Sequence, residues 1–351
     1  MGVTLKFANL WRIIRDVDLD EIRRQAKAPF RLVILDDGVL EEGGGPAARL
    51  RDLFSAPHGP HPAIELHGFD AIWTPGGASV TNLAPHAALV VTSTPHHSSP
   101  LTTAVTRLRQ ARIPIVLVVT GDADRRDDRS LDVDEAVSVA ALDASAVRPI
   151  GAALMKAVPP DTRLALARQL PALRPSMFDV TIEETARANA SYALTTGLAE
   201  VVPLLTVPLN LGDMIVLTKN QLIMAYRLAL AAGRDGEPRQ LIGELLGVLG
   251  GGLLFRQLAR QLVGMIPVIG LVPKIAVAYG GTWAIGRAVT VWLTEGREVT
   301  SELVQSMAAE GLERGRGVAT AMVAQAKSTG LAARSRWDRL RNHLPLRRSR
   351  R

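Results

Sequence analysis

Two patterns of hydrophobic positions divide the chain. Short apolar runs rich in β-branched residues recur in the first half, at 31–36, 69–74, 87–93, 113–120 and 136–141. Stretches with helical periodicity lie between the later runs, as in residues 100–112. Alternating strand and helix signals predict a parallel sheet covered on both faces. We therefore expect an α/β domain over residues 31–175.

Strand signals stop at about residue 177. Long stretches with helical periodicity follow, at 182–202, 210–232, 238–265, 271–295 and 298–327. This pattern predicts an all-α domain over residues 177–328. Small residues recur at every fourth position, in Gly243, Gly247 and Gly251 and again in Ala276, Gly280 and Ala284. That spacing lets helix backbones approach closely, so we expect a tightly packed, glycine-rich bundle.

The apolar segment 245–293 raises the question of a membrane. A spanning helix needs about 20 largely apolar residues. The longest uncharged runs here, 261–273 and 275–286, are separated by Lys274 and interrupted by prolines. A packed bundle in water is the favoured interpretation, and a bent hairpin partly inserted in lipid is the alternative that the sequence leaves open.

The two ends of the chain carry separate signals. Residues 1–30 begin with apolar positions at helical spacing, Phe7, Leu10, Trp11 and Ile14, and predict an amphipathic helix. Packing on its own protein is the favoured interpretation of this helix, and packing on a membrane is the alternative. Residues 334–351 hold eight arginines and one aspartate, while the formal net charge of the whole chain is +7. All the net charge therefore resides in this basic tail, which would be attracted to anionic lipid or nucleic acid or would remain a solvated end. The chain has no cysteine, which excludes disulfides and thiolate metal sites.

Three stretches follow predicted strands where nucleotide chemistry would lie. "GVLEEGGG" at 38–45 follows the first strand, and Gly38 and Gly43 have the spacing of the glycines in a phosphate-binding loop. Such a loop closes with Lys and then Ser or Thr, but Gly44 and Gly45 stand at those positions. "AIWTPGGA" at 71–78 ends the second predicted strand, and "TGDAD" at 120–124 begins at the last residue of the strand predicted at 113–120.

Residues 21–175 resemble the G domain of Era-type GTPases in the order and spacing of these three stretches. Residues 177–310 are similar to the YcjF-type helical domain of unknown function that is attached to some of those GTPases. The second resemblance rests on "TTGLAEVVPLLTVPLNLGDMIVLTKNQLIMAYRLALAAG" and "IPVIGLVPKIAVAYGGTWAIG", and "AVPPDTRLALARQLPALRP" is similar to the linker between the domains. The resemblance implies a P-loop-GTPase-like sheet domain followed by a helical bundle.

The catalytic residues of that family are missing. Trp73 stands where the resemblance would place the Mg²⁺-linked Asp of Asp-x-x-Gly, although Gly76 remains. Gly121 and Asp122 replace Asn-Lys of the guanine motif, and only Asp124 remains. Because phosphoryl transfer depends on positioning and charge stabilisation, little catalysis can remain. We expect a pseudo-GTPase with no catalytic residue, metal or cofactor, and with a vestigial nucleotide site at Gly38, Gly43, Gly76 and Asp124.

Two further sets of polar residues admit alternative interpretations. Six of the seven histidines lie between residues 58 and 97, and a metal or pH sensor built on them is one hypothesis. Their loop positions favour histidines without a ligand. Asp213, Lys219, Asn220 and Gln221 interrupt an apolar helix. Buried hydrogen bonding that sets the helix register is the favoured interpretation, and a polar seam for a partner or a lipid headgroup is the alternative.

The leading hypothesis is a non-catalytic adaptor or scaffold. Its partner would be a protein or an anionic membrane surface, reached through the helical domain and the basic tail, with nucleic acid less favoured. The expected location is the cytoplasm, with association at the inner membrane. The first alternative is a weak GTP- or GDP-binding protein with little or no hydrolysis, and the second is the histidine-based sensor.

Overall fold

The computed structural model describes residues 13–37, 45–56, 60–69, 85–93, 99–121, 131–199, 211–248, 270–296 and 299–343. It divides into two compact units. The first, here called the α/β unit, comprises residues 15–181 and 225–244. The second, the helical unit, comprises residues 1–14, 182–224 and 245–351.

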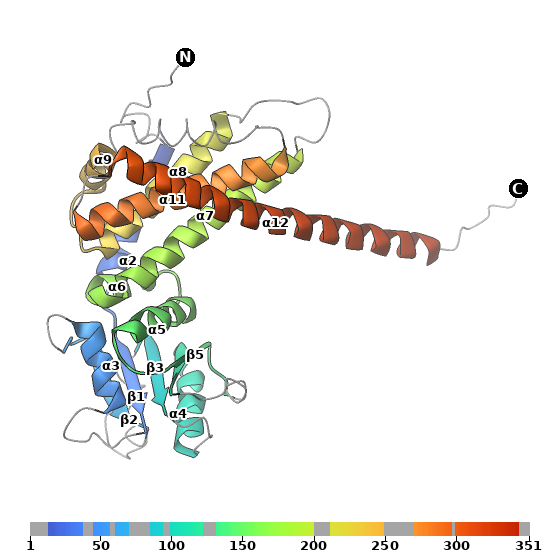
Figure 1. The fold of residues 1–351 in the computed structure, drawn as a ribbon. Coiled ribbons are helices and arrows are strands. Elements are labelled where there is room, and N and C mark those ends of the chain that lie inside the picture. The colour runs from blue at the N-terminus through green and yellow to red at the C-terminus, as the bar shows by residue number, and fades with distance from the viewer. Residues whose placement is uncertain are drawn as a thin grey trace, which may run out of the picture. The chain divides into compact units, whose positions relative to one another are not determined.

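A parallel sheet of five strands organises the α/β unit (Figure 1). The strands are β1 Leu32–Asp36, β2 Ile64–Gly68, β3 Ala87–Thr92, β4 Ile115–Thr120 and β5 Glu135–Val139. Their order is β2-β1-β3-β4-β5, and every neighbouring pair is parallel. The expected combination of a parallel α/β sheet with a largely helical second part is therefore confirmed.

Helices cover both faces of this sheet. They are α3 Pro46–Ser55, α4 Ser99–Gln110 and α5 Ala144–Ala157. The helix α6 Arg163–Gln169 and the short η4 Pro171–Leu173 follow along the chain and pack on other helices. One side of α4, with Leu101, Val105 and Leu108, packs on alternate strand residues such as Val33 and Leu35. Because successive strand residues point to opposite faces, the remaining strand residues face α3 and α5, which contact the strands from the other side.

The second strand differs from its prediction. The sequence pattern indicates residues 69–74, but β2 is Ile64–Gly68, and residues 70–84 lie outside the described part. β2 is an edge strand, paired only with β1 among the described strands, and it carries the partly exposed Glu65 and His67. Edge strands tolerate charged residues, so this strand lacks the apolar run that identifies a central one.

The N-terminal helix predicted for residues 1–30 is interrupted within the described residues. Residues 13–14 are helical, residues 15–17 turn, and α2 runs from Leu19 to Lys27. The Asp18 carboxylate caps α2 by accepting from the Glu21 N–H at 2.8 Å. This cap starts a new helix, whose buried residues are Leu19, Ile22 and Ala26. Phe7, Leu10 and Trp11 lie outside the described residues.

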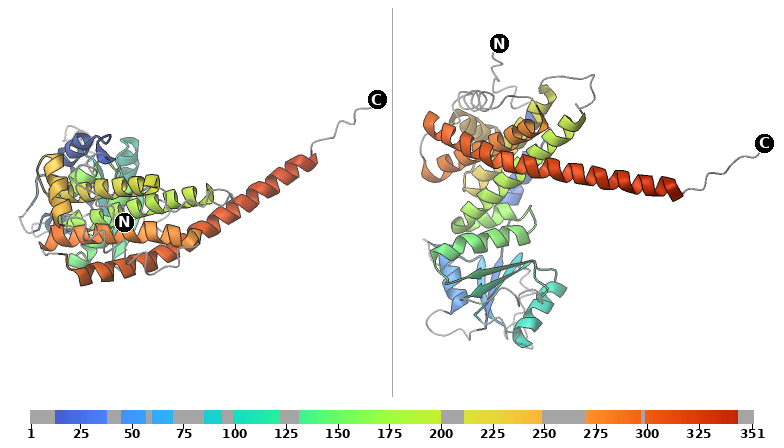
Figure 2. Two further views of the ribbon diagram at one scale, coloured as in Figure 1. Left: turned by 90° about the horizontal axis from the view of Figure 1, so that it is seen from above. Right: turned by 45° about the vertical axis from the view of Figure 1, so that its right-hand side comes forward.

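The second half of the chain is helical, as the periodicity predicts. Its helices are α7 Arg174–Ala199, α8 Leu211–Ala231, α9 Pro238–Val248, α11 Leu271–Glu295 and α12 Ser301–His343. Figure 2 shows α7, α8 and α11 close together, with the first part of α12 crossing over α11, which it contacts. The division of the chain differs from the expected boundary near residue 176, since α7 and α8 each contribute residues to both units. Residues 225–244 therefore belong to the α/β unit rather than to the helical one.

The packing of α11 on α12 depends on small residues. A Cβ added to Gly280 would lie 2.7 Å from the backbone of Gly311, and one added to Gly315 would meet the backbone of Ala276. The close helix approach predicted from Ala276 and Gly280 is confirmed. Within the described ranges, no helix combines the length and the apolarity needed to cross a membrane. Residues 249–269 of the predicted apolar hairpin lie outside those ranges.

Candidate functional site

The carboxyl edge of the sheet is where this fold would hold a ligand. In an open parallel sheet, ligands bind outside the carboxyl ends of the strands, at the point where the chain switches from building one side to the other. In the order β2-β1-β3-β4-β5 this point lies between β1 and β3. Asp36 ends β1 and Thr92 ends β3.

Asp36 occupies the start of the helix that follows β1. Its side chain is buried, at 4% relative exposure, and its Oδ2 accepts from the Ala47 N–H at 2.9 Å. Ala47 lies in the first turn of α3, whose N-cap is Gly45. A Cβ at Gly45 would lie 3.1 Å from Asp36 Oδ2, so this glycine leaves room for the carboxylate. A helix N-terminus at this place is where a nucleotide-binding fold would hold phosphate.

Beyond Asp36, the carboxyl edge of the sheet carries hydroxyl and backbone groups at the ends of β3 and β4. Thr92 is buried, and the Thr120 hydroxyl at the end of β4 donates to the Thr92 carbonyl at 3.3 Å. Gly121 follows with a φ of +99° and donates its N–H to the Val139 carbonyl at 2.9 Å. These bonds tie β3, β4 and β5 together where the resemblance would place a guanine motif.

The helix after β5 is also capped by its own acidic residue. Asp143 accepts from the Ser145 N–H at 2.8 Å and from the Ser145 hydroxyl at 2.5 Å. The hydroxyl bond is the main cause of a lowered pKa at Asp143. The first turns of α3 and α5 thus each bind a carboxylate of this chain.

The four residues predicted for a vestigial nucleotide site are not placed. The residues that lie outside the described part are Gly38, Gly43, Gly76 and Asp124. Gly44 and Trp73 lie outside it as well. The structure therefore neither brings them together nor separates them. Asp36 is the site residue that sequence reasoning missed. Its signal was the acidic pair Asp36 and Asp37 directly after the strand.

Three of the six clustered histidines are described, His61, His67 and His86, and each has different neighbours. His67 Nε2 lies 3.8 Å from Glu65 Oε2. His61 Nδ1 accepts from the Ala63 N–H, and His86 Nδ1 accepts from the Arg31 N–H, both at 3.1 Å. Burial lowers the pKa of His61 and of His86, which favours their neutral forms. In the described part of the chain, no group of three or more potential ligands could hold a metal ion. His58, His96 and His97 lie outside it.

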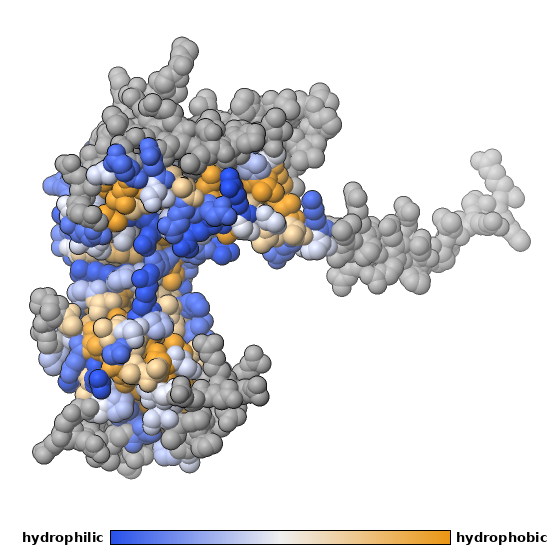
Figure 3. Space-filling view, in the orientation of Figure 1, coloured by the Kyte–Doolittle hydropathy of each residue, from blue (hydrophilic) through white to orange (hydrophobic). Residues whose placement is uncertain are grey.

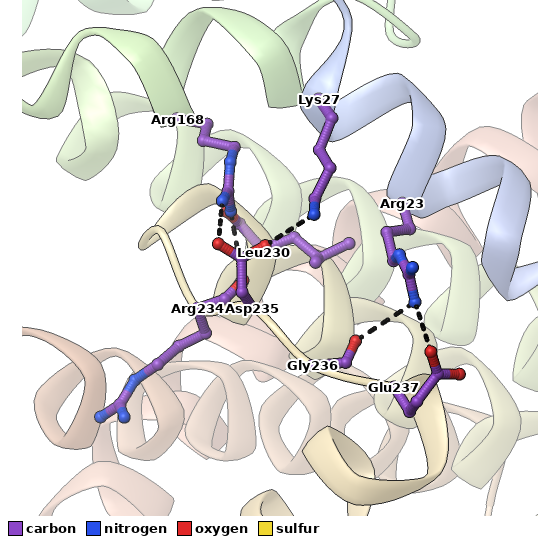
Figure 4. Close-up of polar contacts among 8 residues, drawn as sticks. All are labelled: Arg23, Lys27, Arg168, Leu230, Arg234, Asp235, Gly236 and Glu237. Carbon is purple, nitrogen blue, oxygen red and sulfur yellow. Dashed lines mark hydrogen bonds and ion pairs between the residues drawn. The ribbon is translucent and has the colours of Figure 1, made fainter.

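A second polar cluster joins three segments of the α/β unit (Figure 4). Residues 234–237, here called the acidic turn, connect α8 to α9. Arg168 of α6 donates from Nη2 to Asp235 Oδ2 at 2.7 Å, and from Nη1 to the carbonyls of Leu230 and Arg234 at 2.9 and 3.1 Å. Lys27 of α2 lies 3.0 Å from Asp235 Oδ1. The bond from Lys27, assisted by Arg168, lowers the pKa of Asp235.

The same turn contacts α2 a second time. Arg23 Nη1 lies 3.2 Å from Glu237 Oε1 and 3.5 Å from the Gly236 carbonyl. Lys27 and Arg168 are far from Asp235 along the chain. No local pattern could have paired them with Asp235.

Two of the polar residues that interrupt α8, Asn220 and Gln221, join a hydrogen-bond network in the helical unit. Asn189 and Thr282 are fully buried, and Asn189 Nδ2 donates to Thr282 Oγ1 at 2.8 Å. Asn220 donates to Asn189 Oδ1 at 2.7 Å, and Gln221 donates to Thr282 Oγ1 at 3.0 Å. Asn220 and Gln221 are themselves only partly buried, but their predicted hydrogen bonding within the bundle is confirmed, and it links α7, α8 and α11. The side chain of Asp213 lies outside the described part.

Comparisons with protein-family models, with curated proteins and with solved structures found no match. The resemblance to Era-type GTPases and to the YcjF-type domain therefore stays a hypothesis.

Proposed function

We propose that this protein is a non-catalytic adaptor or scaffold. Its α/β unit has the sheet order of a nucleotide-binding fold but lacks the residues that handle phosphate charge and metal. The observation that carries the proposal is the buried bond between the Asp36 carboxylate and the Ala47 N–H at the start of α3.

Electrostatics explains why this bond argues against a triphosphate. The N-terminus of a helix attracts anions through its unpaired N–H groups and its partial positive charge. Asp36 already uses that attraction. Two like charges about 4 Å apart repel by roughly 4 kcal/mol at an effective dielectric constant of about 20. Gly44 and Gly45, in the positions of the usual Lys and Ser or Thr, supply no compensating charge or metal ligand.

The partner side of the proposal rests on the helical unit and the basic tail. On the face drawn in Figure 3, apolar patches lie among hydrophilic residues of the helical unit. Ile215 of α8 is 47% exposed. The eight arginines begin at Arg334, within the span of α12, so part of the basic tail extends a helix rather than following it. We infer an anionic membrane surface or a protein as the partner, with nucleic acid less favoured, and a cytoplasmic protein recruited to the inner membrane.

A calorimetric titration with GTP and GDP, with and without Mg²⁺, tests the first half of the proposal. We expect no binding to the natural sequence and no GTP hydrolysis above buffer. Mg²⁺-dependent turnover that disappears in Asp124→Ala would contradict the proposal and would favour a nucleotide-dependent protein.

A pair of neighbouring substitutions tests the role of Asp36 itself. Asp36→Asn removes the negative charge while keeping an acceptor for the Ala47 N–H. Asp37→Asn removes the same charge from the neighbouring residue, which is exposed. We expect weak GDP binding to appear in Asp36→Asn and not in Asp37→Asn. Equal behaviour of the two variants would mean that the Asp36 charge does not exclude phosphate.

A further inference from the structure

A basic hollow lies beside the acidic turn in the α/β unit. It has a volume of about 550 Å³, is open to solvent and is lined by Ala26, Lys27, Pro29, Arg168 and Gln169. Lys27 and Arg168 come from α2 and α6, two helices that contact each other. Gln169 fixes this contact, because its Nε2 donates to the Ala28 carbonyl at 2.9 Å.

Positive charge is in excess around the hollow. Arg174 donates from Nη2 to the Arg168 carbonyl at 3.4 Å. Its pKa is lowered, mainly by burial and further by repulsion from Arg168. Among the described contacts, Lys27 and Arg168 thus share one carboxylate, that of Asp235, while Arg174 lies beside Arg168. A group of like charges destabilises the folded state unless an anion compensates it.

Asp235 contacts two of the cations that line the hollow in the manner of a ligand. Its two oxygens contact different cations, Oδ1 with Lys27 and Oδ2 with Arg168, as the oxygens of a bound carboxylate or phosphate would. The Asp235 side chain is 57% exposed, on a turn rather than within a helix or strand. Contacts of such an exposed carboxylate are weak, so an anion from solution can compete with it.

We propose that the basic hollow binds the phosphate or carboxylate group of a ligand, and that Asp235 holds this position as an internal competitor. Entry of the ligand displaces Asp235 from Lys27 and Arg168. The Arg23 contacts with Glu237 and Gly236 are separate, and they keep the acidic turn attached to α2 during the exchange. This site is independent of the proposed function, which rests on Asp36.

Titration calorimetry of the full chain with pyrophosphate at low salt tests the proposal. Asp235→Asn should bind pyrophosphate at least roughly tenfold more tightly than the natural sequence, a ratio equivalent to about 1.4 kcal/mol. Glu237→Gln is the matched control, since it removes the same charge from the same turn but leaves the Lys27 and Arg168 contacts intact. It should bind like the natural sequence. Adding Lys27→Met to Asp235→Asn should abolish the gain.

The proposal is overturned if Asp235→Asn binds no more tightly than Glu237→Gln, or if its gain persists with Lys27→Met. Circular dichroism and thermal unfolding of each variant would establish that the fold is intact. The arginine-rich tail is present in every variant, so pyrophosphate that binds there contributes equally. In the GTP titration, binding that is lost with Lys27→Met belongs to the hollow, and binding that is lost with Asp124→Ala belongs to the edge of the sheet.

Discussion

Individual polar residues in this protein are held by partners that are distant in the sequence. Thr282 is a clear case, because its fully buried hydroxyl accepts from both Asn189 and Gln221 while donating to the Ala278 carbonyl. A buried donor left without its acceptor loses its hydration and gains nothing in return. The network therefore favours one alignment of α7, α8 and α11 over others with similar apolar packing.

Replacing Thr282 by Val should lower the free energy of unfolding by about 1–3 kcal/mol, because it removes an acceptor from the buried Asn189 amide and from the partly buried Gln221 amide. Thr290→Val on the same helix is the control. Its hydroxyl also donates to the carbonyl four residues earlier, that of Gly286, but it does not join this network. We expect its effect to stay within about 0.5 kcal/mol. Urea unfolding would measure both, and equal losses would show that the network contributes no stability of its own.

At the scale of elements, α11 and α12 pack closely because glycines leave room for backbone contact. The space is not uniform along α12. A Cβ at Gly315 would meet the Ala276 carbonyl oxygen, whereas a Cβ at Gly317, two residues later, would have nothing within 4 Å. Helical glycine costs conformational entropy, so it is an advantage only where the contact requires it.

Gly315→Ala should therefore destabilise the protein by about 1–3 kcal/mol, through forced separation of the two helices. Gly317→Ala should be neutral or should stabilise by up to about 1 kcal/mol, since alanine is the better helix former. Thermal unfolding of the two variants would show opposite shifts of the melting temperature. A similar shift in both would mean that the backbones are not in contact at Gly315.

At the scale of the whole molecule, the uneven distribution of charge provides a test of whether the protein binds membranes. Apart from residues 334–351 the chain has no net charge. The part of α12 that packs on α11 includes Gly311 and Gly315, so a chain that ends at residue 333 keeps that contact.

We expect the protein to bind liposomes that contain anionic lipid, because each arginine near such a surface contributes about 1 kcal/mol. Binding should fall steeply with salt, since screening acts over about 10 Å at 0.1 M, and should be lost on deletion of residues 334–351. Co-sedimentation with anionic and with neutral liposomes would measure it. Binding that survives both high salt and the deletion would point to insertion of the 245–293 segment, and a preference for duplex DNA would identify a nucleic-acid arm.

The sequence by itself determined the class of each half of the chain. Apolar periodicity reports which side of a local segment is buried, so residues 271–295 predicted α11 to the residue, and the runs at 31–36 and 87–93 predicted β1 and β3 closely. The sequence did not locate the edge strand β2 correctly, because a half-exposed strand has only a weak pattern of apolar residues.

Only the tertiary structure decided which residues meet. The order of the strands, the Asp36 carboxylate at the start of α3, and the attachment of residues 225–244 to the α/β unit through Asp235 all depend on contacts between distant segments. The buried network shows the same limit, since the sequence marked Asn220 and Gln221 but gave no sign of Asn189 or Thr282 as their partners. Periodicity records whether a position is buried, whereas the identity of its neighbour is set by how the helices and strands pack.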